Sequence, residues 1–211
     1  MPPTNNASPF NIIAAPFTVW YGPEGATFPA IDDEADDFED PAGDFTLVGT
    51  FGNLDYKEDG VTVTHNQTIV PYRALGDCGV RKNFRTEEDQ QVRLMLADIT
   101  LEGYQHALNG NTITTVVASL GVAGHKKIGL SRGFPITTVA LLVRGPSPYI
   151  ANGYMQYEIP RAQQVGNPET VYVKGVPAGL ALTFSSLVDE NAASEDERMG
   201  VLRQMTAVAL T

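Results

Sequence analysis

The sequence predicts a mainly β fold: a β-sandwich or half-barrel with one short flanking α-helix, a long loop, and extended N- and C-terminal arms. Apolar and polar residues alternate with period two through most apolar segments, which is typical of half-buried strands. The 20 glycines and 14 prolines favour turns and short strands over long helices. Because 211 residues suffice for one sizeable core, we expect a single domain over residues 1–211.

The N-terminal part of the chain is expected to be an arm followed by a strand. Residues 1–16 are rich in proline and asparagine, which neither continue a helix nor donate regularly to a sheet, so they predict an extended arm. In 17–21 (FTVWY), Phe17, Val19 and Tyr21 share one face, which predicts the first strand. Gly22 and Pro23 end it.

Charge is concentrated near the N-terminus. The net charge is −11, yet ten acids precede the first base, Lys57, and the rest of the chain carries 14 bases and 15 acids. This balance argues against an ordinary nucleic-acid-binding protein, which needs a basic face. It allows a surface that nucleic acid passes without sticking. The predicted acidic patch consists of Asp32, Asp33, Glu34, Asp36, Asp37, Glu39 and Asp40.

The acidic patch has two readings. Clustered like charges keep a segment extended and solvated. A calcium site is the alternative, but a calcium-binding loop of the common type needs a turn glycine that Asp32–Asp37 lacks. We therefore predict no metal and no cofactor.

Residues 45–51 predict a strand, and a long polar loop over residues 53–85 follows it. Within this loop, residues 61–65 and 68–70 alternate around Asn66 and Gln67, which suggests a hairpin turning there. Residues 75–79 (LGDCG) return the chain. The one basic cluster, which is either a solvated rim or a contact for an acidic surface of another copy, comprises Arg73, Arg81, Lys82 and Arg85.

The remaining elements follow from periodicity. Residues 87–97 predict a strand, and Leu101, Tyr104 and Leu108 then form one apolar stripe of a short helix that Asn109 and Gly110 end. Residues 190–211 predict a C-terminal arm or a loosely docked helix. Further strands are expected over residues 112–120, 125–131, 134–144, 149–159 and 179–189; the fourth of these segments would pair back on the third, which is apolar on both faces and so expected to be central.

Catalytic and targeting signals are missing from the sequence. Its three histidines are far apart, Cys78 is the single cysteine, and no nucleophile elbow or phosphate-binding loop is present. One cysteine allows no intrachain disulfide and fits assembly inside a cell. No run approaches the roughly 20 apolar residues of a membrane span. We therefore expect neither an enzyme nor a membrane protein.

The order of these segments resembles the tail tube (major tail) proteins of long-tailed bacteriophages. The resemblance covers residues 45–110 well and the rest by strand order, with a weaker echo over residues 196–202. No single motif is specific to that family, and the resemblance rests on the order of the motifs. The matching residues are Gly49, Gly52, Asp55, Tyr56, Glu58, Gly60, Val61, Arg73, Leu75, Gly76 and the run 94–109.

The resemblance implies a subunit of hexameric rings that stack into a tube through which DNA reaches the host cell. It implies a virion tail component assembled in the host cytoplasm, with a tail terminator, a distal tail protein and a tape measure protein as partners. DNA would pass without specific binding, along a bore on which acids outnumber bases. The implied inter-ring contacts are Asp55, Tyr56, Val61, Val63, Ile69, Tyr72, Arg73, Arg81 and Lys82.

Two other classes remain open from the sequence. The chain could be another phage ring component, such as a tail terminator or neck protein. The other class, which the sequence favours less, is a β-sandwich binding module or hydrolase. Self-assembly separates these classes, because a tube subunit stacks, a terminator forms single rings, and a binding module or hydrolase forms neither.

Overall fold

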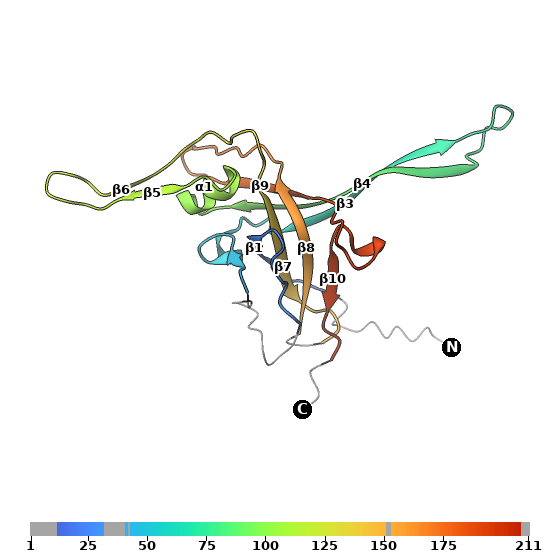
Figure 1. The fold of residues 1–211 in the computed structure, drawn as a ribbon, viewed down its shortest axis with the longest axis horizontal. Helices are drawn as coiled ribbons and strands as arrows, with labels where there is room; N and C mark the ends of the chain where they lie inside the picture. Colours follow the sequence, from blue (N-terminus) through green and yellow to red (C-terminus); the bar gives the residue numbers. More distant parts are fainter. Residues whose placement is uncertain (1–11, 32–40, 42, 151–152, 208–211) are drawn as a thin grey trace.

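The computed structural model describes residues 12–31, 41, 43–150 and 153–207 (Figure 1). The predicted mainly β fold with one short α-helix is confirmed. The strands are β1 Thr18–Pro23, β2 Thr46–Leu47, β3 Thr62–Tyr72, β4 Lys82–Leu96, β5 Ile113–Val116, β6 His125–Ile128, β7 Thr138–Pro146, β8 Tyr154–Gln164, β9 Leu180–Ser186 and β10 Val201–Gln204; the helices are α1 Leu101–Ala107 and the 3₁₀ turns η2 Gly52–Asp55 and η3 Glu195–Glu197.

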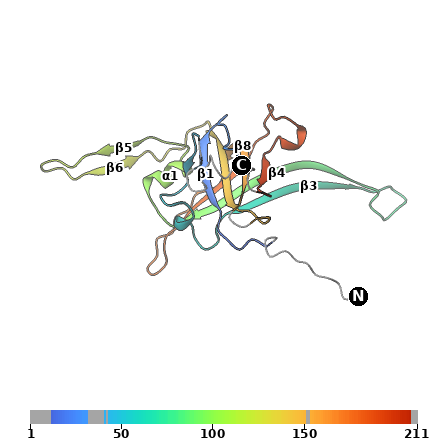
Figure 2. The same cartoon turned by 90° about the horizontal axis from the view of Figure 1, so that it is seen from below.

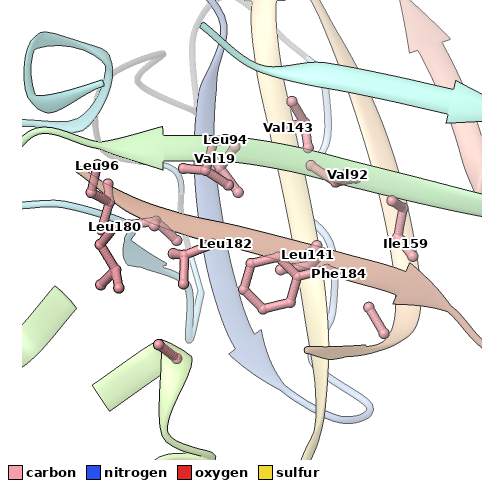
Figure 3. Close-up of a cluster of buried hydrophobic side chains, with 13 residues drawn as sticks. Val19, Val92, Leu94, Leu96, Leu141, Val143, Ile159, Leu180, Leu182 and Phe184 are labelled. Atoms are coloured by element: carbon pink, nitrogen blue, oxygen red, sulfur yellow. The ribbon is translucent and has the colours of Figure 1, made fainter. Parts of the chain in front are cut away.

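Most strands belong to one eight-stranded antiparallel sheet in the order β2-β1-β7-β8-β9-β4-β3, with β10 also paired to β8. Strand β8 is the branch point, because β7 pairs along one side of it while β10 and β9 share the other. Strands β9 and β4 therefore cross over β1 and β7 instead of continuing flat (Figures 1 and 3). The two packed layers are parts of one folded-over sheet, as in a half-barrel.

The main core lies between these crossing layers (Figure 3). Alternate residues of each strand point into it, so the period-two pattern read from the sequence corresponds to burial. Strand β7 is central, as predicted, between β1 and β8. The buried members of the core are Val19, Val48, Val92, Leu94, Leu96, Ala107, Leu141, Val143, Ile159, Ala162, Leu180, Leu182 and Phe184.

A second, smaller cluster covers the other face of β1 and β7, where Trp20 and Leu142 pack with Phe45. The Phe45 ring lies 5.2 Å from that of Phe28. Strand β7 is therefore buried on both faces, as its continuous apolar run predicts.

Helix α1 forms over the predicted apolar stripe and ends where the sequence predicts. The Thr100 hydroxyl accepts a hydrogen bond from the Gly103 amide at 3.1 Å, which caps the first turn. Asn109 and Gly110 end the helix with φ of 63° and 75°. Asn109 also anchors the next segment, because its side-chain amide donates to the carbonyls of Arg132 and Pro135.

The predicted hairpin around Asn66 and Gln67 is wrong. Strand β3 runs unbroken through both residues and pairs with β4, Asn66 opposite Asp89 and Gln67 opposite Glu88. A two-residue hairpin turn needs positive φ at its central residues, which favours glycine over Gln67. The chain turns at residues 73–81 instead, where Asp77 accepts a hydrogen bond from the Gly79 amide at 3.0 Å.

Two other boundaries also differ. Only Thr46 and Leu47 of the expected strand 45–51 are paired, because Gly49 and Gly52 adopt φ of 88° and 60° and turn the chain. Residues 201–204 do not form a docked helix but strand β10, paired to Met155–Glu158 of β8. No helix in the described part of the chain is long and apolar enough to cross a membrane.

Candidate assembly interface

The β3–β4 arm, defined here as residues 65–88, leaves the body of the protein as a two-stranded ribbon (Figures 1 and 2). All of its residues except Ala74 are exposed, and within the described chain its strands pair only with each other. Such a ribbon is at best marginally stable alone in water. The arm nevertheless carries large exposed apolar side chains, which favour contact with another protein surface: Ile69, Val70, Tyr72, Leu75, Val80 and Phe84.

Charge on the β3–β4 arm is segregated along its length. The tip holds Arg73, Arg81, Lys82 and Arg85 with one acid, Asp77. Acids follow at its root, in the run Glu87-Glu88-Asp89. The internal ion pairs are exposed, Arg81–Asp77 at 3.4 Å and Arg85–Glu88 at 3.2 Å, and such pairs contribute only about 0–1 kcal/mol. These charges are therefore able to exchange their partners for those of another chain.

A second projection, the β5–β6 arm of residues 112–136, lies on the opposite side of the body (Figures 1 and 2). It contains Lys126, Lys127 and Arg132 and no acid. Lys126 donates to Glu102 of α1 at 2.6 Å, which ties the arm to the body. Its exposed large apolar side chains are Val117, Leu120, Val122, Leu130, Phe134 and Ile136.

A third, shorter projection spans residues 166–178 and turns at an isolated bridge between Val173 and Val176. Tyr172 at this turn is 70% exposed. The Tyr104 hydroxyl of α1 lies 2.7 Å from that of Thr170 and fixes the base of the projection. Three apolar-tipped projections thus surround one core, an arrangement that a chain acting alone in water would not need.

The structure divides the predicted inter-ring residues into two groups. The members on the β3–β4 arm lie together and exposed near its tip: Ile69, Tyr72, Arg73, Arg81 and Lys82. The others lie at its root, where Val61 and Val63 pack against the main core and Asp55 accepts a hydrogen bond from the Phe51 amide. These root residues support the arm from inside the body.

Tyr56 is the most constrained of the root residues. Its hydroxyl donates to the Val48 carbonyl at 2.9 Å and accepts from the Val19 amide at 3.2 Å. Burial raises the pKa of this hydroxyl well above its ordinary value, so it stays protonated. Gly52 lies in the same corner, where a β-carbon would stand 2.9 Å from the Thr18 methyl group.

An acidic cleft of about 440 Å³ separates the root of the β3–β4 arm from the C-terminal segment. Its acidic side chains are Glu88 and Asp89 of β4 and Glu195 and Asp196 of η3; Arg85, which pairs with Glu88, and His65 also line it. Apolar side chains also line it: Tyr157, Met199, Val201 and Leu202. The sequence predicted neither the cleft nor the β5–β6 arm. The arm did have a signal in the sequence, because residues 111–137 contain no acid and include the apolar run VVASLGVAG.

A cavity of about 170 Å³ beside α1 is lined by apolar and uncharged polar side chains and by His106. Burial lowers the pKa of His106 to about 4, so the ring is neutral at physiological pH. Among the described residues no three His, Cys, Asp or Glu side chains could hold a metal ion together. The predicted acidic patch, Asp32 to Asp40, and residues 1–11 of the N-terminal arm lie outside the described residues.

Comparisons with known proteins found little sequence likeness: no protein-family model and no curated protein matches the chain. Among solved structures, the chain is similar to one in the cryo-EM structure of the anti-feeding prophage baseplate, with 7% identity over 92% of this chain and 95% of that chain. The TM-score is 0.43, too low to establish a common fold, so the function proposed below rests on the chain's own geometry.

Proposed function

We propose that this protein is a structural component of a bacteriophage particle, and more specifically a subunit of stacked rings that form the tail tube of a long-tailed phage. The β3–β4 arm is the observation that supports this most. It projects from the body with apolar and basic side chains at its tip, and it makes no contact that would bury them within the described chain. Contact with another copy would bury these side chains.

Two features favour self-assembly over binding to an unrelated partner. The arm tip is basic while the whole chain carries −11, so a second copy offers complementary charge. The sheet also has open edges at β2 and β3, and joining sheets between subunits would remove exposed edges. In this proposal the chain performs no catalysis, and DNA passes through the assembled bore without specific binding.

Negative-stain microscopy and light scattering of the purified protein test the proposal. We expect rings and stacked tubes. Single rings that never stack would instead indicate a terminator or neck component, and monomers at high concentration would contradict self-assembly altogether.

A shortened variant tests the role of the β3–β4 arm. Deleting β3 alone would remove the only partner strand of β4 over residues 82–90 and remove Val63 from the core, so both strands are cut at matched positions. Residues 71–83 are replaced by Asn-Gly, which joins Val70 to its partner Phe84 and keeps Arg85 and Glu88 of the acidic cleft. We expect a folded protein, judged by circular dichroism and thermal unfolding, that forms rings but no tubes. Tubes of normal length would show that the arm is not the stacking element.

A further inference from the structure

We propose that the tip of the β5–β6 arm of one copy docks into the acidic cleft of a second copy, forming the contact between neighbours within a ring. This inference rests on the proposed self-assembly and assigns the two surfaces that meet. It concerns a different pair of surfaces from the tip of the β3–β4 arm, which the proposed function places between rings.

The tip of the β5–β6 arm has the properties of an inserting element. Leu120 is fully exposed at its end, with Val117 at 80% and Val122 at 47% beside it. Lys127 lies behind this apolar tip, opposite Thr114 in the ladder. Because successive side chains of a strand alternate, Lys127 points away from the face on which Lys126 binds Glu102. Lys127 forms no ion pair within the described part of the chain.

The acidic cleft complements this tip in polarity. The apolar Tyr157 and Leu202, which pair across β8 and β10, line a volume of about 440 Å³. Leu202 is 46% exposed, so a docked side chain would cover apolar surface that water now reaches. Asp196 at the opening is exposed and forms no ion pair among the described residues, which leaves it for a basic partner.

The positions of the two surfaces determine the kind of assembly. The β5–β6 arm extends from the side of the body opposite to the β3–β4 arm (Figures 1 and 2), and the acidic cleft adjoins the root of the β3–β4 arm. The arm therefore cannot fold back into the cleft of its own chain. A contact between two different surfaces is head-to-tail, and repeating it closes a ring or continues as a helix.

Nucleic acid is a poorer occupant for the basic arm. Residues 111–137 hold three lysine and arginine side chains, of which Lys126 binds Glu102 and Arg132 binds the Gly166 carbonyl at 3.2 Å. Only Lys127 and Arg132 lack a carboxylate partner, since a backbone carbonyl does not neutralise the Arg132 guanidinium, and two cations provide little counterion release. The apolar tip and the acidic cleft both favour a protein partner, and a second copy supplies both surfaces at once.

Disulfide trapping is the first test. In a Cys78→Ser background, Leu120→Cys and Leu202→Cys together place one thiol at the arm tip and one in the cleft. We expect mild oxidation to give a ladder of covalent multimers on a denaturing gel. The control pairs Leu120→Cys with Val173→Cys, which lies on the third projection outside the cleft, and should give no ladder. Assembly without a ladder from the first pair, or equal ladders from both, would overturn the inference.

Charge reversal is the second test. Lys127→Glu and Asp196→Lys alone should each raise the protein concentration needed for ring formation about tenfold, and the double variant should return it to within about threefold of the unmodified protein. Lys174→Glu on the third projection is the control and should have no effect. If the protein assembles and neither reversal changes it, the inference fails while the proposed function stands. A protein that remains monomeric overturns both.

Discussion

At the residue scale, Tyr56 shows how the body of the protein holds the root of the β3–β4 arm. Its single hydroxyl joins β1, through Val19, to the segment after β2, through Val48. An isolated bridge between Tyr56 and Leu96 adds the end of β4. Three segments that are distant in sequence therefore meet at one residue, shortly before the chain enters the arm.

Removing this hydroxyl tests its structural role. Tyr56→Phe keeps the ring but leaves the Val19 amide and the Val48 carbonyl without this partner. We expect the free energy of unfolding to fall by about 1–3 kcal/mol, since unsatisfied buried polar groups carry that penalty. Urea denaturation measures it. The matched control is Tyr72→Phe at the exposed arm tip, which should stay within about 0.5 kcal/mol of the unmodified protein. Equal stability of the two variants would contradict a structural role for Tyr56.

At the element scale, the β3–β4 hairpin shows which structural features can be predicted from the sequence and which cannot. Alternation indicated strands over residues 61–65, 68–70 and 87–97, because each side chain's face follows from its own position, but it divided β3 in two and left residues 82–86 of β4 in the loop. The turn was misplaced because residues 61–70 alternate equally well in one long strand or two short ones. Only the register with β4, fixed by the turn at residues 73–81, decides between them. The supporting role of Tyr56 was hidden for a similar reason, since its partners lie 37 and eight residues away.

Helix α1 gives a prediction for pH dependence. His106 on this helix contacts Tyr21 of β1 edge-on, with ring centroids 4.2 Å apart, and its pKa is lowered to about 4 by burial. Unfolded histidine binds its proton below about 6.5, so between about 6.5 and about 4 the unfolded state binds more protons. The contribution of His106 to stability is therefore complete above about 6.5 and declines as pH falls to about 4.

The expected size of this decline in stability determines the design of the experiment. A shift of this extent corresponds to a decline of at most about 3 kcal/mol. Carboxylates also titrate in this range, so the comparison is with His106→Gln, which cannot take up the proton. Urea denaturation at several pH values should show a shallower decline for this variant. Parallel pH profiles would mean that His106 does not titrate as its burial indicates.

At the scale of the whole molecule, charge and shape fit one mode of assembly. The body is one folded-over sheet, and the two arms extend from opposite sides of it (Figures 1 and 2). Bases are concentrated on these arms, at the tip of one and along the other. If the arms are covered by neighbouring subunits, assembly pairs their exposed positive charge with acids of those subunits, and the net charge of −11 per chain remains on the assembly. The free subunit and the assembled particle should therefore differ in their response to DNA.

We predict that the assembled protein does not retain duplex DNA, and that lowering salt does not change this. The net charge is −11 per chain, so the mean interaction with phosphates is repulsive. Reducing ionic strength from about 0.15 M to about 0.01 M lengthens the Debye length from about 8 Å to about 30 Å, which strengthens whichever sign of interaction prevails. A basic binding surface would therefore capture DNA at low salt, whereas a repulsive one would exclude it more strongly. Gel-shift and co-sedimentation assays at both salt concentrations distinguish these outcomes, and DNA that sediments with the particles at low salt would contradict a repulsive assembled surface.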